Sequence, residues 1–408
     1  MALAWTLDRI RDRTPGIRLR IFADTFHYGF ENIAKNTGIY HGERYGANQL
    51  LPTMREQKGD MVDLLILGTC EIDLPKLHSE LLAIWNERPE DQKFKLVCMV
   101  HNTEDLAWQA FIPEWSRRGV LRLVTLGDHV SATFKTKFDE LSESRDLQNF
   151  TSGYESIPID AHYPVLDIPG LPQKSSERIL SKAVIQGSFD SVRRDYNNLF
   201  ADLINSLHDN ASSWGYHPLI GSRKSFVPDH RGAETPFELY LVGSGQIEIP
   251  DELAYMVTVY RNLDYEDFYR FIANCDIVVP AFSSSIYYRF MASSTVALAL
   301  ELNVPILGTL RLRKAYRYID DDRVVVTRPA AMREVSALKA LRTRDASFFL
   351  KSDPSGVGRN LSDILGLESA VDNMLEVGWV RQKKDVDEYK QELWHRNELL
   401  AERLLRDM

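Results

Sequence analysis

The stretch PAFSSSIYYRFMASSTVALALELNVPILGT, residues 280–309, contains a loop, a helix and a strand in direct succession. An apolar run ends at Pro280, a loop rich in Ser and Tyr follows, a helix opens at Ser293, and Asn303 ends it before a second apolar run. Short apolar strands joined through a helix are typical of a parallel sheet that is covered on both faces. The stretch therefore predicts an α/β fold.

The same alternation extends along the chain in both directions. In the first half, residues 74–87 (LPKLHSELLAIWNE) have helical periodicity between two apolar runs. Each half is therefore expected to be a Rossmann-like domain. The runs that predict strands are residues 17–23, 62–70, 94–101 and 121–127 in the first half, and 182–189, 237–245, 256–262, 276–282, 304–309 and 324–328 in the second.

A proline-rich interval separates the two halves. Pro158, Pro164, Pro169 and Pro172 interrupt any regular element, so this interval is interpreted as a linker. From about Asp363 the chain has apolar residues at helical spacing, and this helical tail either crosses back to the first domain or finishes the second on its surface. We predict two facing Rossmann-like domains, residues 1–155 and 181–362, with a linker at 156–180 and C-terminal helices at 363–408.

Composition limits the classes of function. The 408-residue chain has a formal net charge of −9, which argues against a general nucleic-acid binder, because such proteins carry an excess of Lys and Arg. The sequence has no run of about 18 apolar residues and no charged-then-apolar leader, so neither a membrane span nor a secretion signal is expected. Peripheral contact with a membrane stays open.

Three cysteines lie in or at the end of apolar runs: Cys70, Cys98 and Cys275. A free thiol in such a place behaves as a small buried hydrophobe. An odd number of cysteines without metal-ligand spacing argues against a disulfide framework and against a zinc site. We therefore expect no metal site, no bound cofactor, and a reducing, cytoplasmic compartment.

Ligands of open parallel sheets bind beyond the carboxyl ends of the strands, so the residues after each apolar run are candidates for a site. Gly187 and Ser188 end the first strand of the second domain, and Arg193 and Arg194 follow as a helix begins. A small turn lets backbone amides approach an anion, a helix N-terminus favours negative charge, and arginine binds phosphate oxygens through two N–H groups. We predict a bound diphosphate in contact with one of the two arginines. The alternative is an ordinary solvated helix face.

The helix inside residues 280–309 offers a second phosphate contact. Ser293, Ser294 and Thr295 supply hydroxyl groups and free backbone amides at its start. Their alternative role is only to cap the helix.

Two further strand ends give weaker signals. Gly243 and Ser244 lie where a strand enters a glycine-rich loop, which equally suits a plain turn. Tyr260, Arg261 and Asn262 end the next strand, where an aromatic ring and amide groups would stack on and hydrogen-bond a nucleobase. Alternatively, Tyr260 caps the core.

In the first domain, the apolar run of residues 94–101 ends at His101. A histidine at the carboxyl end of a buried strand faces the ligand crevice, where it would act as a base or hydrogen-bond a sugar hydroxyl. The alternative is a structural histidine. Gly38, His41 and Gly42 in an earlier loop are candidates for the acceptor side, with less weight.

Taken in order, these segments resemble the glycosyltransferase B (GT-B) superfamily, particularly its family 4-like retaining enzymes, over nearly the whole chain. The strand end CMVH at His101 looks like the family's catalytic-site histidine, and FELYLVGSG (237–245) looks like its recurring strand-to-glycine loop. Residues 262–282 followed by 294–307 are similar to the donor-site core. The resemblance implies an acceptor-side N-terminal domain and a C-terminal domain that binds a nucleotide-sugar donor of the UDP or GDP type.

The sequence departs from one family motif. Family 4 enzymes usually carry two Glu residues seven positions apart, and the second holds the nucleotide ribose. Counting back from Pro305, the second position falls on Leu298 and the first near Phe290 or Met291. Glu301, one helical turn later, is the candidate substitute for the ribose contact.

The residues and the resemblance together predict a metal-independent hexosyltransferase that moves a sugar from a nucleotide-diphosphate sugar to a small molecule, a glycan or a lipid. Positioned donors neutralise a leaving diphosphate without a metal. Two alternatives stay open: a nucleotide-sugar epimerase or hydrolase on the same fold, and a catalytically inactive GT-B-like binding protein. A nicotinamide-dependent dehydrogenase is disfavoured, because no G-x-G-x-x-G follows the first strand of either half.

Overall fold

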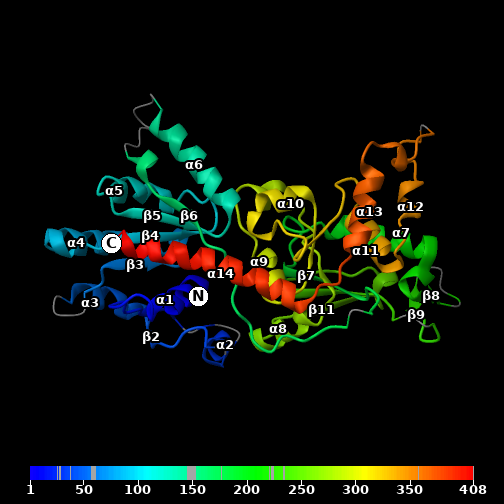
Figure 1. Ribbon diagram of the computed structural model, residues 1–408, viewed down its shortest axis with the longest axis horizontal. Coiled ribbons are helices and arrows are strands. Elements are labelled where there is room, and N and C mark those ends of the chain that lie inside the picture. Colours follow the sequence, from blue (N-terminus) through cyan, green and yellow to red (C-terminus); the bar gives the residue numbers. More distant parts are fainter. Residues whose placement is uncertain are drawn as a thin grey trace.

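The computed structural model shows two α/β halves that lie side by side along the long axis of the molecule (Figure 1). It describes residues 1–24, 26, 29–36, 38–56, 61–144, 153–175, 177–219, 221, 225–232, 235–356 and 358–407.

The N-terminal half is built on a parallel sheet of four strands in the order β3-β4-β5-β6. Its central strands are almost wholly buried, because helices pack on both faces. Phe94, Trp108 and Phe134 are among the largest side chains of the core on one face. The elements of this half are α1 (Ala2–Arg11), β1 (Ile21–Phe22), α2 (Phe30–Asn36), β2 (Arg44–Tyr45), α3 (Leu50–Arg55), β3 (Leu64–Leu67), α4 (Cys70–Glu87), β4 (Lys95–Val100), α5 (Ile112–Ser116), β5 (Leu121–Thr125), α6 (Asp128–Ser142) and β6 (Ile159–Ala161).

The C-terminal half is built on a parallel sheet of six strands in the order β11-β10-β7-β12-β13-β14. Counted from β7 as the first strand, this is the doubly wound order 3-2-1-4-5-6, which reverses between β7 and β12. Ligands of such sheets bind outside the carboxyl ends of the strands at the reversal point. The strands are β7 (Lys182–Ser188), β10 (Glu238–Ser244), β11 (Val257–Arg261), β12 (Ile277–Val278), β13 (Ile306–Gly308) and β14 (Val325–Thr327), and β8 (Tyr216–Pro218) and β9 (Phe226–Pro228) form a separate antiparallel pair.

Helices cover both faces of this sheet. One face is packed by α7, α11 and α13, and the other by α8, α9 and the first turns of α14. The predicted fold class, two Rossmann-like α/β domains with a C-terminal helical tail, is therefore confirmed. The helices are α7 (Tyr196–Asn210), α8 (Tyr265–Ala273), α9 (Ser294–Glu301), α10 (Leu310–Ala315), α11 (Glu334–Thr343), α12 (Ser347–Leu350), α13 (Leu367–Val377) and α14 (Lys383–Arg406).

The last helix, α14, spans both halves (Figure 1). Its first part packs Trp394 into the core of the C-terminal half. Its last turns place Leu400 and Leu404 with helix α1 against one face of the N-terminal sheet. Glu398 forms ion pairs with Arg9 and Arg13 (2.9 and 2.6 Å). The helical tail thus crosses back to the first half.

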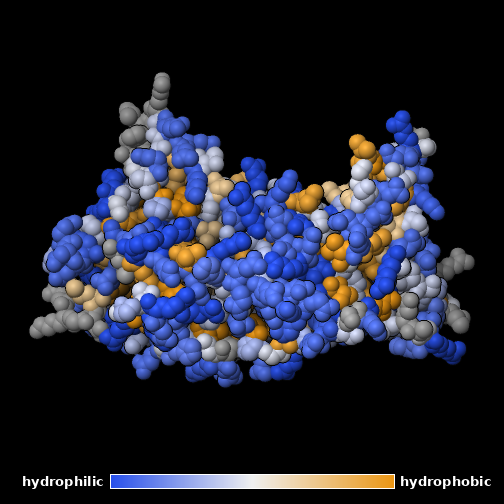
Figure 2. Space-filling view, viewed as in Figure 1, coloured by the Kyte–Doolittle hydropathy of each residue, from blue (hydrophilic) through white to orange (hydrophobic). Residues whose placement is uncertain are grey.

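The helices and the surface can be compared with what a membrane-spanning protein requires. None of the described helices is both long and apolar enough to cross a bilayer. The face shown in Figure 2 is mostly hydrophilic, and apolar side chains gather on it over α11 and α13. Phe348, Ile364 and Leu365, which lie on α12 and just before α13, are exposed.

The structure differs from the sequence-based interpretation in two places. The interval interpreted as a linker, 156–180, contains β6, which pairs with β5 and completes the N-terminal sheet. Cys70 and Cys98 were expected to be free thiols, but they form a disulfide, because the start of α4 lies beside β4. Cys275 is free and buried, and burial raises the pKa of its thiol to about 12.

Candidate functional site

The loops that follow β7 and β12 meet at the reversal point of the C-terminal sheet. Asp195 N donates to Ala281 O (2.8 Å), and Ser283 N donates to Arg193 O (3.2 Å). These bonds join the two strand ends between which the doubly wound order places a ligand.

Both glycines at these strand ends are required by close approach. Gly187 has φ of 132°, and a Cβ atom there would lie 3.1 Å from Arg194 Nη2. A Cβ atom at Gly243 would lie 1.8 Å from Gly187 O. Ser188 and Ser244, which follow, are exposed at the rim.

Arg194 is buried at this point, with 4% of its surface exposed. Its Nη2 donates to Gln186 O (2.9 Å) and Thr295 Oγ1 (2.8 Å), and its guanidinium group lies over Phe282 and Tyr287 (4.9 and 5.7 Å). Nε and Nη1 are buried without a hydrogen-bond partner, and no ion pair to a carboxylate is seen within the part of the chain that the structure describes. Burial lowers its pKa. A buried cation without an anion is costly, so the arrangement calls for a negatively charged partner.

Arg193 differs sharply from its neighbour. About half of its side chain is exposed, and its Nε lies 3.6 Å from Asp190 Oδ2. It can therefore turn toward a ligand in solution, whereas Arg194 is held in place.

The start of α9 faces the same point. Thr295 is buried, and its hydroxyl bridges Arg194 and Gln186, while Ser293 is buried and Ser294 is exposed. The first N–H groups of a helix have no partner within it, and the helix dipole makes them an anion site. Ser293, which occupies the N-cap position, makes no side-chain hydrogen bond to the helix.

His101 approaches α9 from the other half of the molecule. It follows β4, and its backbone carbonyl accepts Ala292 N (3.4 Å), one residue before Ser293. The neighbouring Thr103 N donates to Phe290 O (2.9 Å). The structure therefore brings His101 together with Ser293 to Thr295 and, through them, with Arg194.

His129, at the start of α6, has a structural role at the same boundary. Its Nδ1 and Nε2 lie 3.1 Å from Ala315 O and Met291 O, respectively, both in the C-terminal half. The ring is buried, and burial lowers its pKa. Its polar atoms thus connect the two halves.

Glu301 does not reach the crevice, so its predicted ribose contact is wrong in this structure. It ends α9, and its Oε1 accepts Leu166 N from the connection between the halves (2.9 Å). Burial raises the pKa of the carboxyl to about 7. Leu298, the position counted for the second Glu, is buried in the core. Neither Leu298 nor its candidate substitute Glu301 therefore supplies a carboxylate to the site.

The predicted nucleobase residues separate. Tyr260 packs its ring against Phe271 (4.5 Å) beside the core, which is the alternative considered for it. Arg261 is exposed beside the loop after β10. Asn262 has φ of 53°, and its N–H donates to Gly243 O (3.1 Å). All three lie at the end of β11, but Tyr260 packs against α8, whereas Arg261 and Asn262 are exposed.

The predicted acceptor-side loop is tied to α1. His41 Nδ1 lies 2.6 Å from Asp8 Oδ2. Gly38 has φ of 65°, and a Cβ atom at Gly42 would lie 2.2 Å from Tyr40 Oη. These contacts explain the residues structurally, and their acceptor role stays a prediction.

Sequence reasoning missed Glu71, which lies in the first turn of α4. Its Oε1 accepts His101 N (2.6 Å) and Asn102 N (2.9 Å). The search for polar residues after apolar runs, applied to residues 62–70, would have found it.

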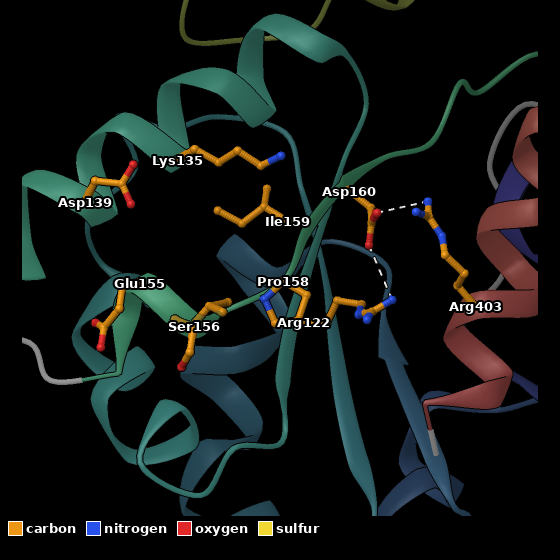
Figure 3. A pocket seen from close by; sticks show the side chains of 10 residues that line it. Arg122, Lys135, Asp139, Glu155, Ser156, Pro158, Ile159, Asp160 and Arg403 are labelled. Carbon is orange, nitrogen blue, oxygen red and sulfur yellow. Dashed lines mark ion pairs between the residues drawn. The ribbon is translucent and has the colours of Figure 1, made fainter.

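A cavity of about 500 Å³ lies away from this crevice, at the amino ends of β5 and β6. Figure 3 shows Asp160 between Arg122 and Arg403, with ion pairs of 3.3 and 3.0 Å. Asp160 neutralises both arginines, and the cavity lies at the opposite ends of the strands from the crevice.

No protein-family model and no curated protein matches this sequence. Among solved structures, the pneumococcal O-GlcNAc transferase in complex with UDP and GlcNAc matches at 10% identity and a TM-score of 0.43, over 88% of this chain and 61% of that one. A UDP-N-acetylglucosamine 2-epimerase from Rickettsia bellii matches at 12% identity and 0.39, over 92% of both chains. The glycotransferase of kitacinnamycin matches at 11% identity and 0.37, over 99% of this chain and 94% of that one.

The chain spans about three fifths of the length of the first solved structures that it matches. At such identities and TM-scores the likeness assigns no function, which is argued below from the site.

Proposed function

We propose that this protein is a glycosyltransferase of the hexosyltransferase type, which transfers a sugar from a UDP- or GDP-linked donor without a metal ion. The diphosphate lies between the loop after β7 and the start of α9, and the acceptor enters from the side of His101.

The observation that carries this proposal is the buried guanidinium group of Arg194, which has no carboxylate partner among the described residues, at the reversal point of a doubly wound sheet. A positive charge held in a low-dielectric place stabilises an anion more strongly than one in water. Arg194 is positioned to supply this field, and the half-exposed Arg193 to contact the phosphate oxygens.

His101 is the proposed base that takes the proton of the acceptor hydroxyl. In the proposed step the acceptor O–H bond breaks and its proton goes to the imidazole. The oxygen forms a bond to the anomeric carbon, and the bond from that carbon to the diphosphate breaks with its electron pair on the phosphate oxygen. Developing charge on that oxygen is neutralised by Arg193 and by the N–H groups at the start of α9.

The test is calorimetric binding of UDP, GDP and ADP, and of their common sugar conjugates, with EDTA present. We expect selective micromolar binding to one nucleotide, lost in the double variant Arg193→Ala, Arg194→Ala. The single variants separate the two roles: Arg193→Ala weakens binding about tenfold, and Arg194→Met weakens it about a hundredfold. Absence of binding to every nucleotide would overturn the donor site.

The chemistry is tested with the nucleotide sugar that binds. Transfer to a small-molecule, glycan or lipid acceptor supports a transferase, whereas loss of the sugar to water or inversion within the donor indicates the hydrolase or epimerase alternative. Binding without turnover points to an inactive relative, which the missing Glu pair, at Leu298 and near Phe290 or Met291, favours.

A cytoplasmic location is part of the proposal; the bond between Cys70 and Cys98 argues against it and supplies its test. Disulfides are rare in reducing compartments. The protein is isolated from its native cells with a thiol-blocking reagent present and then unfolded, and the blocked cysteines are counted. All three cysteines should be blocked if the protein works in the cytoplasm, and only Cys275 if it does not.

A further inference from the structure

Glu71 binds the backbone that carries His101. One carboxylate oxygen, Oε1, accepts both His101 N (2.6 Å) and Asn102 N (2.9 Å). The other oxygen, Oε2, is buried and has no hydrogen-bond partner among the described residues. Glu71 lies in the first turn of α4, where the helix dipole interacts favourably with a carboxylate.

The imidazole of His101 is fixed from the same side. Its Nε2 lies 3.2 Å from Gly68 O, just before α4. A carbonyl oxygen can only accept a hydrogen bond, so this contact requires Nε2 to carry the proton when the ring is neutral. The lone pair is then on Nδ1.

We propose that Glu71 is a positioning residue for His101: together with the Gly68 carbonyl it holds the imidazole as the Nε2–H tautomer, so that Nδ1 is the atom that accepts the acceptor's proton. This inference rests on the proposed function. It identifies Nδ1 of His101 as the nitrogen that takes the proton, and Glu71 as the carboxylate that holds His101 in position.

The charge of Glu71 gives it a second task in the same step. When the acceptor proton moves to Nδ1, the ring becomes an imidazolium ion on the residue whose backbone N–H is bound by Glu71, a carboxylate whose second oxygen has no partner among the described residues. An anion held next to a developing cation stabilises it without reorganisation. A purely structural carboxylate, which only holds the loop, would be replaced without loss by the neutral amide of Gln.

Histidine-labelled full-length protein tests the tautomer without any substrate. Long-range ¹H–¹⁵N spectra at pH 8, with His101 assigned through His101→Gln, should show a proton on Nε2 and none on Nδ1. The same pattern is expected in Asp73→Asn, a matched control in the same helical turn, whose carboxylate accepts Thr69 N instead of the His101 loop (3.0 Å). In Glu71→Ala the ring signals should move to those of a freely rotating histidine. A proton on Nδ1 in the wild type, or an unaltered ring in Glu71→Ala, overturns the proposal.

Kinetics test the charge. Glu71→Gln keeps an oxygen that accepts the backbone N–H groups, and it should lower kcat roughly tenfold while leaving KM for the donor and the Kd of UDP or GDP unchanged. Asp73→Asn should alter none of these. Full kcat in Glu71→Gln means that Glu71 serves the fold alone. If no nucleotide binds the wild type, the proposed function fails, while the spectra still decide how His101 is held.

Discussion

Two arginines are buried at opposite ends of the C-terminal sheet, and they differ in how many of their N–H groups are hydrogen-bonded. Arg342 of α11 is 3% exposed, and its Nε, Nη1 and Nη2 donate to Ser213 O, Leu180 O and Thr235 O (2.9, 2.6 and 2.7 Å). Arg194, equally buried, has hydrogen bonds to the described residues on Nη2 alone.

The difference separates a structural cation from a functional one. Arg342 uses its whole fork on carbonyl oxygens near the amino ends of β7 and β10, so it completes the fold. Arg194 lies at the carboxyl ends of the strands, where the fold leaves two of its donors without protein acceptors. Burial by itself does not mark a site, but burial with unsatisfied donors does.

The largest effect on stability is expected at the satisfied arginine. Arg342→Ala leaves three carbonyl groups, one of them buried, without their donor and empties a buried site, and it should lower the free energy of unfolding by about 3–5 kcal/mol. Urea denaturation measures this change. The exposed Arg359→Ala is the control and should stay within about 0.5 kcal/mol of wild type. A small effect of Arg342→Ala would break the comparison.

Next comes the buried carboxyl at the far end of α9. Burial raises the pKa of Glu301 to about 7 from an ordinary value of 4.5, so the folded state holds a proton that the unfolded state has lost between these values. Stability should therefore fall as pH rises through this window. Glu301→Gln removes the dependence, and above pH 7 it should be more stable than wild type by up to about 3 kcal/mol. Equal unfolding curves at pH 5 and a gap at pH 8 are the expected result; a parallel shift at both pH values contradicts it.

A smaller effect is expected from the hydroxyl that orients Arg194. Thr295→Val keeps the shape but removes the acceptor for Arg194 Nη2, so nucleotide affinity should fall about tenfold and stability by about 1 kcal/mol. Calorimetry and thermal unfolding give the two values. Thr343→Val, which removes an exposed hydroxyl on α11, is the control. If nucleotide affinity is unchanged, the hydrogen bond from Thr295 to Arg194 is not needed for ligand binding.

The smallest effect is expected at a surface ion pair. Arg403 is about half exposed, and Asp160 keeps its contact with Arg122 when Arg403 is removed. Arg403→Ala should therefore change the free energy of unfolding by about 0.5 kcal/mol or less. If Arg403→Ala lowered the free energy of unfolding as much as Arg342→Ala, the exposure of an arginine would not predict its contribution to stability.

The sequence was sufficient to predict which loops meet in the crevice, because apolar runs reveal strands and parallel strands end at one edge. It could not tell which of Arg193 and Arg194 is buried, since adjacent residues differ only in the direction of their side chains. Glu301 was misplaced for a related reason: its position along α9, known from spacing, turned out to be the end that faces the connection between the halves.

Long-range pairing was the other source of error. The interval with Pro158 and Pro164 was interpreted as a linker, yet residues between these prolines pair with β5. The strand was missed because an edge strand of three residues leaves no periodic signal in the sequence. Cys70 and Cys98 lie 28 residues apart, and only the packing of α4 on β4 brings them together.

The course of α14 has a consequence for a nicked chain. Asn397 binds both polar backbone atoms of Tyr163, and Trp394 Nε1 donates to Val165 O (2.8 Å), so the connection between the halves runs alongside this helix. If a protease cut the connection between the two sheets, the C-terminal fragment would still carry α14. The last turns of this helix would remain packed on the sheet of the N-terminal fragment. The fragments would migrate together until a denaturant is added, because the peptide bond between the halves is not what keeps them together.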